Sequence, residues 1–178
     1  QYILQSCNNL GCTDSDTLSV SGNLLNSIGT ITPNNTEPTN TPGFGYVSLA
    51  LSSDATTLAV AAKTNEEGET GEVYVFTNTD GDWSQQAVLK ASNSEPNDLF
   101  GSAISLSSDG NMLVVGAAGE DSNATGINGD QTNNTSTDSG AVYIFTRDSN
   151  ANWQQQTYLK TSNTDTKDRF GGAIAMSS

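Results

Sequence analysis

An internal repeat constrains the fold of this chain more than any other feature. The dipeptide Phe-Gly recurs along the chain, at residues 44–45, 100–101 and 170–171. Three longer segments also recur in the same order, as LSSD at 51–54 and 106–109, VY(V/I)FT at 73–77 and 142–146, and W(S/Q)QQ(A/T)(V/Y)LK at 83–90 and 153–160. The Phe-Gly spacing is 56 residues and then 70, and nearly all of the difference lies between Ala118 and Gly140. The second copy therefore carries a long insertion, and a period of this size indicates stacked supersecondary units.

Each copy contains four short strand-like runs, separated by clusters of Gly, Asp, Asn and Ser and without helical periodicity. The predicted strands cover 46–52, 57–62, 72–77, 83–89, 100–107, 112–117, 140–146 and 153–159, with a further one at 170–176. Four antiparallel strands per repeat are typical of a β-propeller blade. The sequence thus predicts an all-β fold with two blades (43–98 and 99–168) and the start of a third (169–178). Two blades and one strand cannot close a ring, so we expect other segments or subunits to complete the propeller.

The repeat also resembles a known family. Residues 100–118, FGSAISLSSDGNMLVVGAA, resemble the FG-GAP repeat of integrin α-chain β-propellers, with Ala118 at a position where the family usually has Pro. The following GEDSNATG at 119–126 and SGAVYIF at 139–145 resemble the bacterial, secreted branch of these repeats. The resemblance covers residues 43–178 and implies a secreted or cell-surface protein. It also implies a calcium loop of the form DxDxDG, but the matching turn here has a single carboxylate, Asp109, so that metal site is not transferred.

The N-terminal region has a different pattern. Cys7 and Cys12 flank a turn-forming sequence between two β-prone runs, which predicts a hairpin over residues 1–21. A structural disulfide between the two cysteines in an oxidising compartment is the favoured interpretation, and two free thiols are the alternative. Residues 2–12 with 16–20 resemble the last two strands of a bacterial fibronectin type III domain, and the Pro-, Asn- and Thr-rich residues 22–42 are predicted to form a linker.

Composition excludes several classes of function. The chain has 20 acidic and 6 basic residues, a formal net charge of -14, and no histidine. Nucleic acid is therefore an unsuitable partner, and an anionic membrane surface is disfavoured for the same reason. No apolar run is long enough for membrane insertion. The absence of histidine removes the usual zinc sites and His-dependent nucleophilic catalysis.

The insertion contains a candidate calcium loop. Asp121, Asn123 and Thr125 alternate before Gly126, and Asp130 follows, so that their oxygens can converge on one hard cation. A solvated polar loop closed by Asx turns is the alternative interpretation. Apart from this possible Ca²⁺, no cofactor is expected.

Propeller geometry predicts that the insertion lies beside residues 91–99 and 161–168. The acidic residues of this face are Glu95, Asp98, Glu120, Asp121, Asp130, Asp138, Asp165 and Asp168. Because propellers commonly bind partners through loops on one face, the leading hypothesis is a non-catalytic extracellular adhesion module with a protein or glycan ligand. The alternatives are a structural or assembly subunit and, with least support, a propeller-based carbohydrate-active enzyme. Trp83 and Trp153 are interpreted as packing between blades, with a sugar-stacking platform as the alternative.

Overall fold

The computed structural model describes residues 5–8, 11–14, 31, 34, 44–62 and 70–177, and these residues contain no helix. None of them forms a helix long and apolar enough to cross a membrane. The strands are β1 (Gln5–Asn8), β2 (Gly11–Asp14), β3 (Phe44–Leu51), β4 (Thr57–Ala62), β5 (Glu72–Thr79), β6 (Asp82–Leu89), β7 (Phe100–Leu106), β8 (Met112–Ala117), β9 (Ala141–Arg147) and β10 (Trp153–Leu159). The predicted all-β class is confirmed, and the predicted strands of both copies agree with β3–β10 to within two residues.

The chain divides into two compact units, Gln1–Thr32 and Pro33–Ser178. In the first unit, β1 and β2 pair as an antiparallel hairpin in which Cys7 stands directly opposite Cys12. This confirms the hairpin, and the disulfide stays a prediction. The second strand expected from the fibronectin resemblance, at 16–20, lies outside the described residues, as does the predicted linker except for Ile31 and Asn34.

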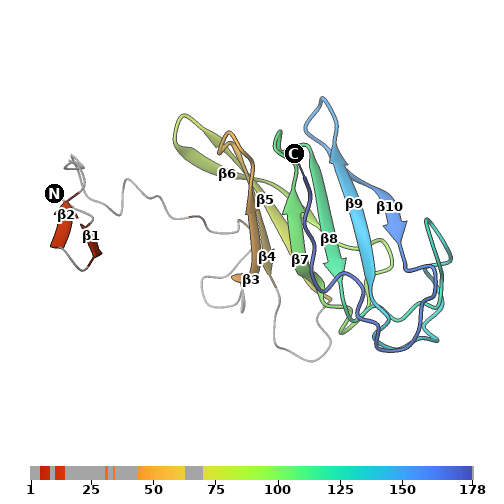
Figure 1. Ribbon diagram of the computed structural model, residues 1–178. Helices are drawn as coiled ribbons and strands as arrows, with labels where there is room; N and C mark the ends of the chain where they lie inside the picture. Colours follow the sequence, from red (N-terminus) through yellow and green to blue (C-terminus); the bar gives the residue numbers. More distant parts are fainter. Residues whose placement is uncertain are drawn as a thin grey trace. The chain divides into compact units, whose positions relative to one another are not determined.

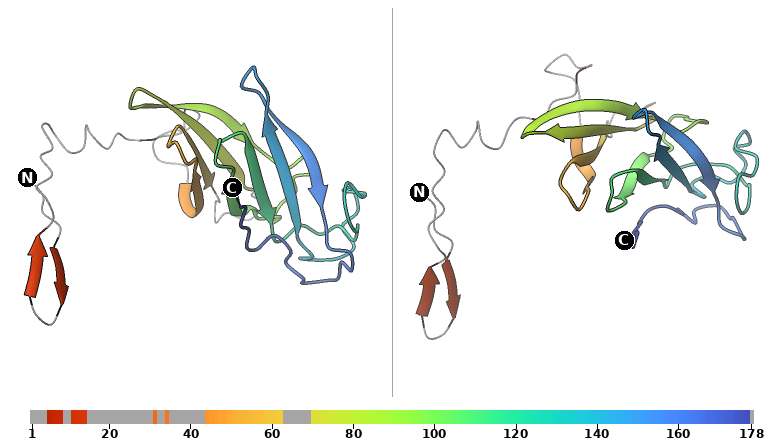
Figure 2. Two further views of the ribbon diagram at one scale, coloured as in Figure 1. Left: turned by 45° about the horizontal axis from the view of Figure 1, so that its top comes forward. Right: turned by 90° about the horizontal axis from the view of Figure 1, so that it is seen from above.

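The second unit contains two four-stranded antiparallel sheets with the orders β3-β4-β5-β6 and β7-β8-β9-β10. Each sheet is a simple meander, because every strand pairs with the next strand of the chain. The sheets lie side by side, and the first strand of one, β3, contacts the first strand of the other, β7 (Figure 1). Figure 2, seen from above, shows both sheets as strongly twisted. Two successive meanders joined in this way are consistent with two propeller blades.

The same turn joins the first two strands of both sheets. Asp109 Oδ1 accepts hydrogen bonds from Ser107 Oγ at 2.6 Å and from Asn111 N at 3.0 Å. In the first copy Asp54 Oδ1 accepts the corresponding bonds from Ser52 Oγ and Thr56 N, at 2.6 and 3.0 Å. The bonds from the Ser107 side chain and from the backbone and side chain of Asn111 lower the pKa of the Asp109 carboxyl to about 2, with the bond from Ser107 contributing most. Asp109 therefore lies in the predicted hairpin turn.

The hydrophobic core lies between the two sheets. Small and β-branched side chains of β4 and β5 pack against aromatic side chains of the second sheet. Phe100 is fully buried, and its ring makes edge contacts with Tyr143 and Phe145, at centroid distances of 5.6 and 6.0 Å. Such aromatic pairs add to the burial energy. Both contacts join β7 to β9 within the second sheet.

At the end of the sheets where β9 leads into β10, Trp153 Nε1 donates a hydrogen bond to Gln86 Oε1 of β6 at 2.8 Å. Arg147 lies over the Trp153 ring and donates to the same Gln86 oxygen at 3.1 Å, and to Thr57 Oγ1 at 3.2 Å. Trp153 is half-buried against the core. The predicted packing role between blades is confirmed for this tryptophan.

Phe170, at the start of the third copy, bonds to the preceding copy in the same way as Phe100, at the start of the second copy. Phe100 N donates to Thr70 O at 3.3 Å, and Phe170 N donates to Ser139 O at 3.0 Å. The backbone conformation also repeats, because Leu99 and Arg169 both have positive φ, at 60° and 53°. Beyond its bridge to Gly140, Phe170 is followed by no strand up to residue 177. The strand predicted over 170–176 is therefore not formed, because within the described residues the bridge to Gly140 is the only strand-type pairing of this segment.

Candidate functional site: the loop surface

Three connections meet at one end of the two sheets, and we call them together the loop surface: residues 91–99, 118–139 and 160–169 (Figure 1). The insertion 118–139 is bonded to both neighbours. Asn134 Nδ2 donates to Glu95 Oε2 at 2.7 Å, and Lys167 N donates to Thr137 O at 2.8 Å. The predicted position of the insertion, between the two connections, is confirmed.

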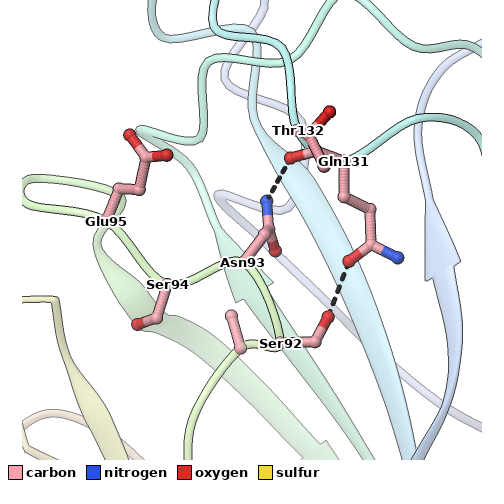
Figure 3. A pocket seen from close by; sticks show the side chains of 7 residues that line it. Ser92, Asn93, Ser94, Glu95, Gln131 and Thr132 are labelled. Atoms are coloured by element: carbon pink, nitrogen blue, oxygen red, sulfur yellow. Dashed lines mark hydrogen bonds between the residues drawn. The ribbon is translucent and has the colours of Figure 1, made fainter.

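A groove of about 410 Å³ lies where the first connection meets the insertion, as Figure 3 shows. Its lining residues are Ala91, Ser92, Asn93, Ser94, Glu95, Gln131 and Thr132. Ser92 Oγ donates to Gln131 Oε1 at 2.6 Å, and Asn93 Nδ2 donates to Gln131 O at 3.2 Å, so the two walls are bonded together (Figure 3). The groove thus offers hydroxyl, amide and carboxylate groups on a braced backbone, which is a surface suited to recognising a polar ligand.

A fully buried ion pair lies beneath this groove. Lys160 Nζ contacts Glu120 Oε2 at 2.7 Å, and the two side chains are 0% and 1% exposed. Lys160 Nζ also donates to Ser139 Oγ at 2.7 Å, and Ser122 N donates to Glu120 Oε2 at 3.2 Å. The sequence places Glu120 among the acidic residues of this face, and the structure shows that it is buried there and paired with Lys160. A buried charge pair persists only when its remaining hydrogen-bonding positions are satisfied, as they are here.

Two tyrosines and an asparagine extend the network. Tyr158 O–H donates to Glu120 Oε1 at 2.8 Å, and Asn93 Nδ2 donates to the same oxygen at 3.1 Å. Tyr143 O–H donates to Asn93 Oδ1 at 2.7 Å. Burial, reinforced by the nearby Glu120 charge, raises the pKa of Tyr143 far above its ordinary range. Tyr143 therefore remains a hydrogen-bond donor at every physiological pH.

Asp98 is a buried carboxyl group that none of the basic residues described here contacts through an ion pair. Burial, together with the charges of Glu120, Glu95 and Asp121, raises its pKa to about 7 against the opposing bond from Glu95 N. That bond joins Glu95 N to Asp98 Oδ2 at 2.9 Å. Asp98 is therefore partly protonated near neutral pH.

The predicted calcium residues take part in separate turns. Asp121 Oδ1 accepts a hydrogen bond from Asp138 N at 2.7 Å, and Asp130 Oδ1 accepts bonds from Thr132 N and Oγ1 at 2.9 and 2.7 Å. Asn123 and Thr125 are exposed. Among the described residues no group of three or more Asp, Glu, His or Cys side chains could hold a metal ion. The predicted site combines two carboxylates with an amide oxygen and a hydroxyl oxygen, so this search does not test it. Calcium binding by these four residues stays a prediction.

Sequence reasoning missed the buried network. The acidic face predicted from the sequence includes Glu120, but its pairing with Lys160 was not predicted, and neither Asn93 nor Tyr143 was given a role. The available signal was the lysine repeated at positions 90 and 160.

In a comparison with protein families, residues 83–145, from β6 to β9, match the FG-GAP repeat family. This segment contains the whole insertion and the Phe-Gly strand β7, so the match supports an FG-GAP repeat over these residues. No curated protein matches the chain.

Proposed function

We propose that this chain is part of a non-catalytic, extracellular adhesion module, built on integrin-like FG-GAP propeller repeats, that binds a protein or glycan ligand through the loop surface. The observation that carries the proposal is the groove between residues 91–95 and 131–132. It lies at the junction of two connections, and binding residues are commonly placed on loops that a rigid sheet supports. The FG-GAP match supports a binding function at the level of the family.

The chemistry of the groove indicates the kind of ligand. Its side chains carry hydroxyl, amide and carboxylate groups and no basic group. The whole chain has a net charge of -14, which repels anionic ligands. We infer that the ligand is neutral and polar or cationic, such as an uncharged glycan or a basic protein segment. Binding of a cationic ligand weakens as salt increases, whereas binding of a neutral glycan does not.

We further propose that the two sheets are blades of a propeller completed by other segments or subunits. The repeated contact of Phe100 with Thr70 and of Phe170 with Ser139 supports this, because the third copy begins on the second sheet in the geometry of a new blade. Light scattering on the whole protein tests it. Complete rings or complexes of two or more chains are expected, and an isolated monomer holding only two sheets would contradict it.

The binding proposal is tested with an array of immobilised glycans and extracellular matrix proteins. The test variant is Gln131→Ala with Thr132→Ala, which removes polar groups from one wall of the groove. The control variant is Ser149→Ala with Asn150→Ala, two exposed residues in the turn at the opposite end of β9 and β10. Losing directional polar contacts in a ligand site is expected to weaken binding by about tenfold or more. The control should bind like the original protein, and equal binding by both variants would reject the groove as the site.

A further inference from the structure

We propose that Lys160 and Asn93 form an intramolecular amide bond, with Glu120 as the proton-transferring residue and Tyr143 as the group that stabilises the reacting carbonyl oxygen. The reaction requires an amine, a carboxamide, a proton acceptor that contacts both, and exclusion of water. The amine, the proton acceptor and Tyr143 belong to the buried network, and the carboxamide is that of Asn93, which is half-buried and lines the groove.

The amine and the amide meet on one carboxylate. Lys160 Nζ lies 2.7 Å from Glu120 Oε2, and Asn93 Nδ2 lies 3.1 Å from Glu120 Oε1. A single carboxylate therefore contacts both the nucleophile and the leaving group. Glu120 can accept a proton on one oxygen and deliver a proton from the other, as general acid-base catalysis requires.

The carbonyl of Asn93 is already polarised. Tyr143 O–H donates to Asn93 Oδ1 at 2.7 Å, and the high pKa of this tyrosine keeps the donor protonated. A donor placed on the oxygen that becomes negative stabilises a tetrahedral intermediate. Asn93 Nδ2 is held on the other side by Glu120 and by Gln131 O, so the amide plane is fixed.

The site also excludes water from its charged groups. The side chains of Lys160 and Glu120 are 0% and 1% exposed, and Tyr143 and Tyr158 are fully buried. An amine attacks only in its deprotonated form, and Glu120, which contacts Lys160 Nζ at 2.7 Å, is the base that can take up its proton. Because the reacting groups are already held in place, the reaction does not incur the entropy cost of bringing free side chains together.

The reaction balances without an oxidant or a cofactor. Lys160 Nζ gives a proton to Glu120, and its lone pair attacks Cγ of Asn93, so that the π electrons of the carbonyl move onto Oδ1. When the carbonyl re-forms, the Cγ–Nδ2 bond breaks, and Nδ2 receives the second proton of Nζ through Glu120. The released ammonia takes up the first proton as ammonium, which restores the Glu120 carboxylate. The product is one Nζ–Cγ amide bond.

The first copy provides an internal comparison. Lys90 has the same place in the repeat as Lys160, but it is about half exposed and pairs with Glu72 at 2.6 Å. Within the described residues, no asparagine side chain contacts Glu72 or Lys90. Lys90 is therefore expected to remain a free amine and serves as the matched control in the same molecule.

The bond would join the connection after the first sheet to the end of the second sheet, and it would enclose nearly the whole second copy in a covalent loop. Closing a long loop lowers the conformational entropy of the unfolded chain and resists unfolding. This property suits a module that carries mechanical load outside the cell, and that interpretation rests on the proposed adhesion function.

Mass spectrometry of the folded whole chain tests the bond. The expected protein is lighter by one ammonia, and trypsin no longer cleaves after Lys160. Residues 148–167 then remain covalently attached to residues 91–147, while cleavage after Lys90 is complete. Cyclisation of Gln1 or succinimide formation at Asn128 also releases ammonia, so the attachment of the two peptides, rather than the mass alone, is the deciding observation.

Three variants assign the roles. Lys160→Arg and Asn93→Ala remove a reacting group, and Glu120→Gln keeps the side-chain size but removes the proton acceptor. All three should retain the full mass and show separate peptides, and circular dichroism must show β-sheet in each. Tyr143→Phe should slow formation of the bond without abolishing it, because attack still occurs without the donor to Oδ1.

Two results would overturn the assignment. One is complete trypsin cleavage after Lys160 in folded protein kept for days at room temperature. The other is loss of water with a peptide joined at Glu120, which would mean that the lysine reacts with the carboxylate instead. Both results concern the link alone, so neither affects the test of ligand binding.

Discussion

The two copies of the repeat place a lysine at the same position and use it differently. Lys90 pairs with Glu72 of its own sheet, and the side chains are 53% and 26% exposed. Lys160 pairs with Glu120 of the insertion, and this pair is buried. The tyrosines at matching positions of the two copies differ in the same way. Tyr74 O–H donates to Glu72 of its own strand, whereas Tyr143 O–H donates to Asn93 of the preceding connection.

The difference shows what the insertion adds. In the first copy Glu72 bonds to Tyr74 of its own strand and to Lys90 next to the neighbouring strand, and the ion pair between Lys90 and Glu72 remains at the surface. In the second copy the insertion supplies Glu120 and the preceding connection supplies Asn93, so the pair joins three segments of chain. The buried network is thus a joint between consecutive copies.

The largest expected effect follows from breaking the buried pair. Lys160→Met leaves Glu120 buried without its cation, which is expected to cost about 3–5 kcal/mol of unfolding free energy. Lys90→Met at the exposed pair is expected to cost less than about 1 kcal/mol. Urea unfolding of both variants measures the difference. Similar losses in the two variants would mean that the networks are energetically equivalent despite their different burial.

A second comparison concerns the glycines at the copy junctions. Gly71 and Gly140 have φ of 84° and 78°, and a Cβ at either position would overlap the carbonyl oxygen of Phe100 or Phe170. Gly71→Ala should cost about 2–4 kcal/mol, because Phe100 is fixed in the core and cannot move. Gly140→Ala should cost only the strain of its backbone, about 1 kcal/mol, since Phe170 begins a segment that can shift. A larger loss for Gly140→Ala in a urea titration would show that the third copy is docked as firmly as the second.

The pH dependence of stability should report on the buried carboxyl group of Asp98. The pKa of Asp98 rises from the ordinary 3.8 to about 7 in the folded protein, so folding favours its protonated form. Its contribution to stability is therefore present below pH 4 and is lost as the pH rises to about 7. Asp98→Asn should therefore make the melting temperature less dependent on pH between 4 and 7 than it is in the original protein. An unchanged pH profile in Asp98→Asn would assign the titration to another group.

Calcium binding is expected to have the smallest effect. Ca²⁺ at Asp121, Asn123, Thr125 and Asp130 would raise the melting temperature by binding the folded state alone. The variant Asp121→Asn with Asp130→Asn keeps an oxygen acceptor at each position but removes both charges. Calorimetric titration should give heat for the original protein and none for the variant. If the original protein gives no heat and no change in melting temperature, the four residues form only polar turns.

The strands could be predicted from the sequence because the same pattern of strand-like segments recurs in both copies. The hydrogen bonds of a turn such as SSDGN form between residues close in sequence, as the bonds to Asp109 show. The local sequence is therefore enough to predict such a turn. The pairing of Lys160 with Glu120 was not predictable in this way, because it depends on how a long insertion folds back over a strand end. The same is true of Asp98, whose burial is due to the insertion above it, since Gly119 N donates to Asp98 O at 3.0 Å.

The contact of each Phe-Gly segment with the preceding sheet has a consequence for biosynthesis. Phe100 N bonds to Thr70 O and Phe170 N bonds to Ser139 O, and both acceptors are synthesised before the phenylalanine that binds them. The backbone contact of a new repeat can therefore form as the repeat leaves the ribosome, and folding can advance from the N-terminal end one repeat at a time. The Phe100 ring is covered later, when Tyr143 and Phe145 follow. Only the most recently made sheet would then expose an apolar face, which limits the surface available for aggregation during synthesis.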